Sequence, residues 1–163
     1  MEQTHEMIRR ILDAELAPAL GCTEPAAYGL CAAAAARRAE GEILRITIRA
    51  SAAMVKGVQY VKIPHSGGLR GGKLAAALGA LAGDPADGLE IFRHVGPETL
   101  AQAQRLVRSG AVTLKLADSV PRLWICVTVE GARRAGRAVI RDRHDRVLYP
   151  EEDGQLPTEQ KQE

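Results

Sequence analysis

The sequence has few aromatic residues and few cysteines, and it lacks a strong excess of charge of either sign. Its 163 residues include one Trp, one Phe and three Tyr, and 22 Lys and Arg stand against 20 Asp and Glu, for a net charge of +2. Nucleic-acid binding needs a basic surface and often aromatic stacking platforms, so this composition argues against it. The amino terminus also lacks the continuous apolar run of a signal peptide or membrane span. We therefore expect a cytoplasmic protein that contacts no membrane.

The three cysteines are too few and too widely spaced for a disulfide framework, so each is judged singly. Cys31 lies in an alanine-rich segment and Cys126 in an apolar one, which favours core positions for both. Cys22 directly precedes an expected helix, whose unpaired backbone N–H groups favour a thiolate. From the residues alone, Cys22 is either a small buried turn residue or a nucleophile or metal ligand.

Hydrophobic periodicity predicts one α+β domain over residues 1–150, with amino-terminal helices, a central glycine-rich loop with helices, and a small, mainly antiparallel sheet. The polar tail 151–163 has no apolar period, and we expect it to be disordered. Helical spacing and helix-start signals predict helices over 5–17 and 74–81 and after Asp84 and Pro97. A further helix should start at a Thr23 cap and continue through the alanine-rich run 26–36, whose small side chains permit close approach by a neighbouring element. Strand-like patterns lie at 43–49, where Leu44, Ile46 and Ile48 share one face, and at 58–63, 112–116, 123–129 and 137–141.

A glycine-rich loop runs from His65 to Gly72, ahead of a predicted helix. Residues 67–73 match the start of a phosphate-binding loop, but Leu74 replaces the Ser or Thr that would hold magnesium. The loop fits a turn that lets two elements pack closely, although its N–H groups could bind a carboxylate. His65 flanks this loop and fits either a substrate contact or a surface position. His144 lies in a charged turn, and we expect the charges of that turn to be solvated.

Residues 18–25, Pro-Ala-Leu-Gly-Cys-Thr-Glu-Pro, resemble the signature of the L-cysteine desulfidase family. The carboxy-terminal half of that family is related to the α-subunit of iron–sulphur L-serine dehydratases. The resemblance covers most of residues 8–140. A second block has the order of the family's residues and nearly their spacing, and it comprises Lys56, Ile63-Pro64, Gly67, 75–81, Gly83 and 88–90. A third, weaker block comprises 126–129 with Gly131.

The resemblance implies a subunit or half of a lyase that eliminates the β-substituent of L-cysteine or L-serine and yields pyruvate and ammonia. It implies that Cys22 ligates a [4Fe–4S] cluster, one iron of which lacks a protein thiolate and can act as a Lewis acid. Site roles carried over from the resemblance are catalytic for Thr23 and Glu24, and substrate-binding for Lys56, His65, Ser66 and Gly67.

The family's other cluster cysteines lie in a carboxy-terminal half that has no counterpart here, and one thiolate cannot hold a cubane cluster. We therefore expect a partner subunit that carries the other cluster cysteines, and a small-molecule amino acid as ligand. Homo-oligomerisation is possible as well. The sequence also departs from the family pattern: 65–68 replace Gly-Thr-Gly, 57–58 replace Asn-Gly, and 131–134 replace Gly-His-Thr-Asn. These departures support the alternative of a non-catalytic amino-acid-binding or regulatory module derived from the family.

Overall fold

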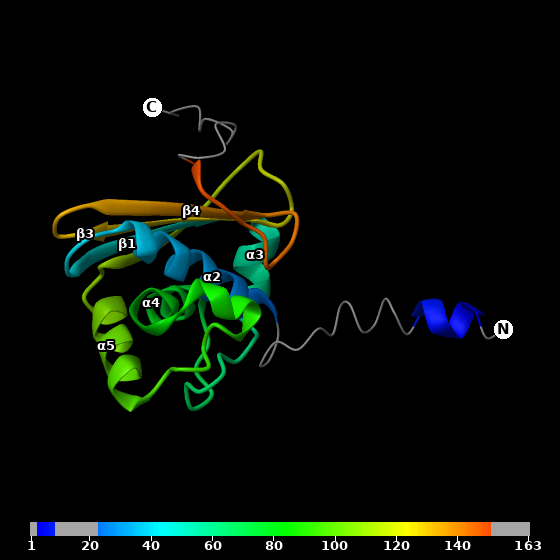
Figure 1. The fold of residues 1–163 in the computed structure, drawn as a ribbon, viewed down its shortest axis with the longest axis horizontal. Helices are drawn as coiled ribbons and strands as arrows, with labels where there is room; N and C mark the ends of the chain where they lie inside the picture. The colour runs from blue at the N-terminus through cyan, green and yellow to red at the C-terminus, as the bar shows by residue number, and fades with distance from the viewer. Residues whose placement is uncertain (1–2, 9–22, 151–163) are drawn as a thin grey trace.

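The computed structural model describes residues 3–8 and 23–150, and the second of these ranges forms a sheet with helices on one face (Figure 1). Of the helix predicted over 5–17, residues 5–8 are helical, and the rest lies outside the described residues, as do Cys22 and the tail 151–163. From residue 23 the elements are α2 (Thr23–Arg38), β1 (Ile43–Ala50), α3 (Ala52–Val58), α4 (Gly72–Ala82), the 3-10 helix η1 (Pro85–Glu90), α5 (Pro97–Arg108), β2 (Val112–Leu116), β3 (Trp124–Gly131), β4 (Ala135–Arg141) and β5 (Val147–Leu148).

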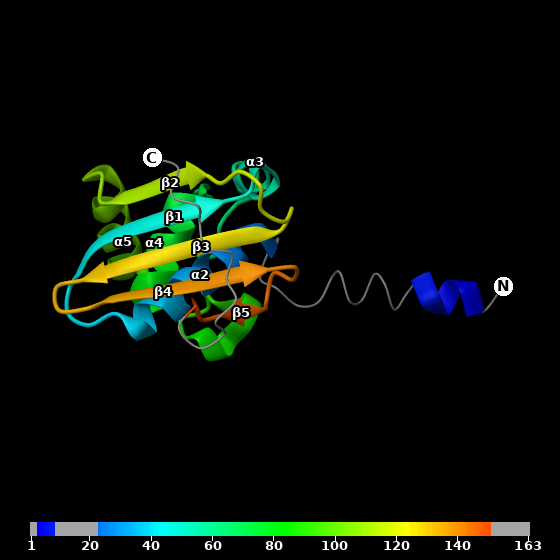
Figure 2. The same cartoon turned by 90° about the horizontal axis from the view of Figure 1, so that it is seen from above.

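The sheet has the strand order β2-β1-β3-β4-β5 (Figure 2). β1 pairs antiparallel with β3, and the β3–β4 and β4–β5 pairs are also antiparallel. The predicted α+β class with a mainly antiparallel sheet is therefore confirmed. β1 and β2 are parallel, which the sequence did not predict. A parallel pair needs a long crossover, and here it carries α3, α4, η1 and α5.

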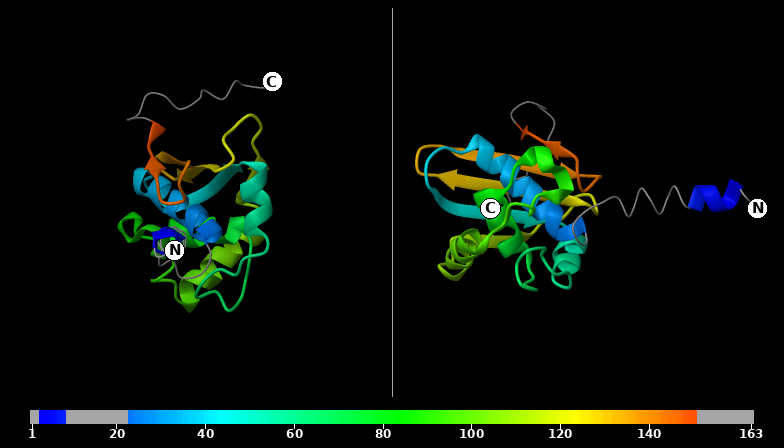
Figure 3. Two further views of the ribbon diagram at one scale, coloured as in Figure 1. Left: turned by 90° about the vertical axis from the view of Figure 1, so that its right-hand side faces the viewer. Right: turned by 60° about the horizontal axis from the view of Figure 1, so that its bottom comes forward.

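The alanine-rich helix α2 packs between α4 and the strands β3 and β4 (Figures 1 and 3). A methyl group placed on Gly79 of α4 would lie 2.5 Å from the carbonyl carbon of Gly29 in α2. On the other side, a methyl group on Gly136 of β4 would lie 2.6 Å from the Ala39 nitrogen. The close approach that we predicted from the small side chains of this helix is confirmed.

Strand β1 follows its predicted alternation only in part. Ile46 and Ile48 are buried on the helical side of the sheet, but Leu44, predicted to share their face, is 55% exposed. The pairing register with β3 shifts between Ile43 and Arg45, and such an irregularity breaks the period of two that would have buried Leu44.

The strand predicted over 58–63 was wrong. Residues 52–58 form helix α3, and beyond it Lys62 makes only an isolated bridge with Arg70. The hydroxyl oxygen of Ser51 caps this helix by accepting a hydrogen bond from the Met54 backbone N–H at 3.4 Å. A serine cap followed by two alanines favours a helical turn, and this local signal outweighed the β-branched residues.

The helix predicted after Asp84 is the 3-10 helix η1, and Asp84 caps it by accepting a hydrogen bond from the Ala86 N–H at 3.0 Å. The helix predicted from Pro97 is confirmed as α5. Within 3–8 and 23–150, no helix combines the length and the apolar character that crossing a membrane requires. A cytoplasmic location stays a prediction.

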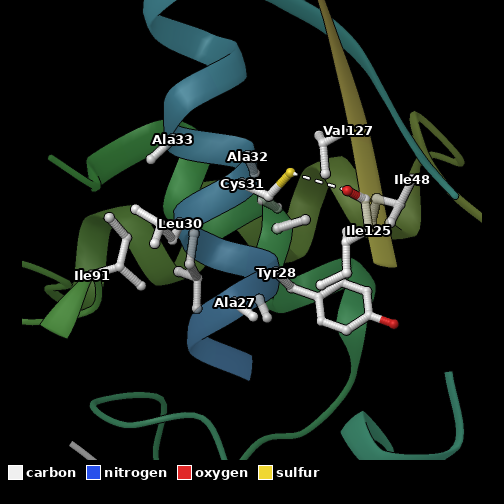
Figure 4. Close-up of a cluster of buried hydrophobic side chains, with 14 of the residues drawn as sticks. Ala27, Tyr28, Leu30, Cys31, Ala32, Ala33, Ile48, Ile91, Ile125 and Val127 are labelled. Carbon is white, nitrogen blue, oxygen red and sulfur yellow. Dashed lines mark hydrogen bonds between the residues drawn. The ribbon is translucent and has the colours of Figure 1, made fainter. Parts of the chain in front are cut away.

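Cys31 and Cys126 are both core residues, as predicted. Cys31 points from α2 to the sheet, where its thiol lies 3.3 Å from the Ala138 carbonyl oxygen and 3.8 Å from that of Ile125 (Figure 4). Burial raises the pKa of the Cys31 thiol. Cys126 lies on the opposite sheet face, and the Arg137 Nε–H donates a hydrogen bond to its sulfur at 3.2 Å. Burial raises the pKa of Cys126 as well, although Arg137 opposes the shift.

Candidate functional site

The first turn of α2 carries Thr23 and Glu24, both of them half-buried. Thr23 is itself the first helical residue, whereas we predicted that it would cap the helix. A carboxylate in the first turn suits the positive end of the helix dipole, which accounts for Glu24 at this position. Cys22, the predicted cluster ligand, lies outside the described residues.

The Glu24 side chain lies against α3. A methyl group placed on Gly57 would lie 3.2 Å from Glu24 Cγ, so glycine at this position gives the glutamate room to pass. Burial lowers the pKa of His144 from its ordinary value, and the nearby carboxylates of Glu24 and Asp145 oppose that shift. Glu24 is thus one of the charges that act on the pKa of His144. His144 is half-buried, whereas most of the charged residues of its turn are exposed, as expected.

Lys56 precedes Gly57 on α3 but faces a different region. It lines an open hollow of about 500 Å³ between α3 and the loop that joins β2 to β3. Asp118 and Arg122 of that loop line the same hollow. Successive residues of an α-helix point about 100° apart, so α3 presents Gly57 to Glu24 and Lys56 to the hollow.

The glycine-rich loop uses Ser66 for its own structure. The buried Ser66 hydroxyl lies 2.6 Å from the Ile63 carbonyl oxygen, to which it donates, and accepts from the Leu69 N–H at 3.0 Å. His65 and Gly67 are exposed and have positive φ angles of 61° and 73°. The loop geometry therefore explains Ser66 as a turn residue, and substrate binding by these three residues stays a prediction.

Tyr28 connects the start of α2 to the end of this loop, and the sequence reasoning missed it. Its ring carbon Cε1 would lie 3.0 Å from a methyl group on Gly72, the first residue of α4. Tyr28 is fully buried, burial raises its pKa, and its hydroxyl has no hydrogen-bond partner within the described part of the chain. A signal was present, because Glu24 and Tyr28 are four residues apart and so share a helix face.

The donor set fits only a shared metal site. Residues 3–8 and 23–150 contain no group of three or more His, Cys, Asp or Glu side chains that could hold a metal ion. Cys31 and Cys126 are sealed in the core on opposite faces of the sheet. A [4Fe–4S] cluster would therefore need most of its ligands from outside these residues.

The chain with this α+β fold is homologous to proteins named UPF0597 proteins. It is 42% identical over 142 residues to one from Nitratidesulfovibrio vulgaris (strain DP4), a match that covers 87% of this chain and 32% of the relative. For the relative from Desulfatibacillum aliphaticivorans the identity is 40% over 154 residues, which covers 93% of this chain and 35% of the relative. For the relative from Geobacter sulfurreducens the identity is 38% over 146 residues, which covers 90% of this chain and 34% of the relative.

The chain thus spans about a third of the length of these relatives. Their shared name states no activity. No family model matches the chain.

Proposed function

We propose that this chain forms one part of an iron–sulphur-dependent lyase that converts L-cysteine or L-serine to pyruvate and ammonia. The observation that supports the proposal is the first turn of α2, which contains residues 23–25, the last three of the family-like motif. Glu24 of that turn lies close to Gly57 of α3, and its charge acts on the pKa of His144. A cysteine just before a helix N-terminus forms a thiolate readily, and a thiolate is what iron requires.

In this proposal Cys22 is the single ligand that the chain contributes. The other cluster cysteines come from a separate carboxy-terminal-half polypeptide. This is supported by the length of the UPF0597 relatives, of which this chain spans about a third. When bound, the cluster supplies a Lewis-acidic iron for the substrate. Glu24, two residues along the chain from Cys22, and His144, on whose pKa Glu24 acts, are groups that can accept and hold a proton. Thr23 orients the surroundings of the ligand.

The test is anaerobic co-purification of this chain with the unmatched part of the N. vulgaris relative, supplied as a separate polypeptide. We expect the complex to contain iron and sulphide, to show cluster absorbance, and to release pyruvate from L-cysteine or L-serine. Cys22→Ala should abolish the cluster absorbance while the two chains still associate. Cys126→Ala removes one thiol from a core position and should leave the iron content unchanged. Equal iron in the Cys22→Ala complex would refute the ligand role.

A non-catalytic amino-acid-binding module is the second candidate. It is favoured by the Ser66 hydroxyl, which is engaged within its own loop, and by the absence of a metal-ligand group among the described residues. Calorimetric titration with L-cysteine and L-serine should then show binding without turnover. Lyase activity in the two-chain mixture would decide against this candidate.

A further inference from the structure

The hollow beside α3 lies at the edge of the sheet where its parallel pair of strands ends. β1 and β2 run parallel, so their carboxyl ends at Ala50 and Leu116 lie at the same edge of the sheet. β1 continues into α3, and β2 continues into the loop that leads to β3 on the far side of β1. The hollow lies between these two connections.

Hydrogen bonds fix the walls of the hollow. The Ser51 backbone N–H donates to the Trp124 carbonyl at 3.0 Å, and the Ser51 hydroxyl donates to the Arg122 carbonyl at 2.5 Å. The start of α3 is thus tied to the β2–β3 loop. In the same loop Ser119 has a φ of 58°, a left-handed conformation that residues other than glycine adopt rarely and that is found disproportionately at functional sites. The shape of the hollow is therefore built in, not left to mobile side chains.

Three charged side chains line the hollow without neutralising one another. Lys56 and Arg122 are cationic and Asp118 is anionic, all three are exposed, and no ion pair joins them in the described part of the chain. Alanines and Val120 supply the apolar lining. The volume of about 500 Å³ suits a small molecule, because ligand sites measure roughly 300–1,000 Å³.

We propose that this hollow binds a small carboxylate whose neighbouring carbon carries a hydrogen-bond donor, as in α-hydroxy and α-amino acids. The planar guanidinium of Arg122 can bind the carboxylate through two parallel hydrogen bonds, and Lys56 adds a second positive charge. Asp118 accepts from the hydroxyl or ammonium group next to the carboxylate. The site is distinct from the α2 turn and does not depend on the lyase proposal.

The test uses the whole chain in calorimetric titrations with four probes: D-glycerate, L-serine, acetate and inorganic phosphate. We expect glycerate or serine to bind more tightly than acetate and phosphate. Lys56→Gln and Arg122→Gln should each weaken that binding about tenfold or more, the loss expected for one charge-assisted contact. Arg108→Gln, a charge change on the exposed end of α5, is the matched control and should leave binding unchanged.

Asp118→Asn separates the parts of the proposal. This variant should reduce the affinity for glycerate and for serine toward that for acetate. If glycerate loses more affinity, Asp118 prefers a hydroxyl donor; if serine loses more, it prefers an ammonium donor. Cys22→Ala should bind as the wild type does, so that failure of the lyase proposal leaves this result intact. Absence of binding to all four probes would overturn the inference. So would phosphate binding as tight as that of glycerate and serine, or binding that neither Lys56→Gln nor Arg122→Gln weakens.

Discussion

The crossing of α2 and α4 is a position where adding a single methyl group should cost stability. In Gly79→Ala the new Cβ would lie 2.5 Å from both the Cα and the carbonyl carbon of Gly29, whereas carbon atoms pack at about 3.5–4.0 Å. The obstacle is backbone and cannot rotate away, so the two helices must separate by roughly 1 Å. Overpacking of this kind costs about 1–3 kcal/mol and sometimes more, while the better helix propensity of alanine returns about 1 kcal/mol.

We therefore expect Gly79→Ala to lower the free energy of unfolding by about 2 kcal/mol, a large part of a total of roughly 5–15 kcal/mol. The only tryptophan, Trp124, is buried, so its fluorescence reports unfolding in urea. The midpoint should fall and the slope stay constant. Gly96→Ala is the control, because a methyl group there meets nothing within 4 Å and φ is −120°. Unchanged unfolding of Gly79→Ala would refute the close helix contact.

The remaining predictions concern single contacts. Ser51→Ala should lower stability by about 1–2 kcal/mol in urea unfolding, because it removes a helix cap and a tie to the β2–β3 loop, whereas Ser109→Ala on the exposed end of α5 should change it less. Asp84→Ala should cost about 1 kcal/mol in the same assay through loss of the η1 cap. Glu24→Gln should lower the pKa of His144 further, as measured by NMR titration, because it removes a carboxylate that favours the charged imidazolium. His144 already has a depressed pKa in the folded state, so stability falls as the pH drops below the ordinary value of 6.5, and His144→Gln should remove that part of the loss.

The sequence predicted the elements whose signals are local. Leucine spacing marked α4, the Asp-Pro and Pro starts marked η1 and α5, and alternation marked most of the strands. The parallel pairing of β1 with β2 could not be predicted, since it depends on contacts between residues more than 60 positions apart, such as Ile46 and Val112. The position of Leu44 was lost to a register shift, which has no signature in the strand's own sequence.

The sequence named candidate site residues one by one, but it did not indicate how they are arranged. Glu24 and Lys56 were both proposed from the family-like motifs, yet they face different regions on either side of α3. Glu24 acts on the pKa of His144, which lies in the turn between β4 and β5, and nothing in the charged sequence of that turn indicated this. The fold thus places Glu24 and Lys56, which the family-like motifs grouped, in different regions. It also links His144, which no motif in the sequence selected, to Glu24 through its pKa.

Helix α3 is the element that the two proposed sites share. It has seven residues, it is tied at its start through Ser51, and it presents Gly57 to the α2 turn and Lys56 to the hollow. Glu24 Cγ lies 3.2 Å from the position that a methyl group on Gly57 would take, so this side chain passes close to α3, and a displacement of α3 changes its surroundings. A ligand that draws Lys56 inward changes the α2 turn only if it binds the two positions of α3 with different affinity. Adding glycerate or serine to fill the hollow beside α3 while the pKa of His144 is followed by NMR measures that coupling directly. His144 serves as the reporter because its pKa responds to the Glu24 carboxylate.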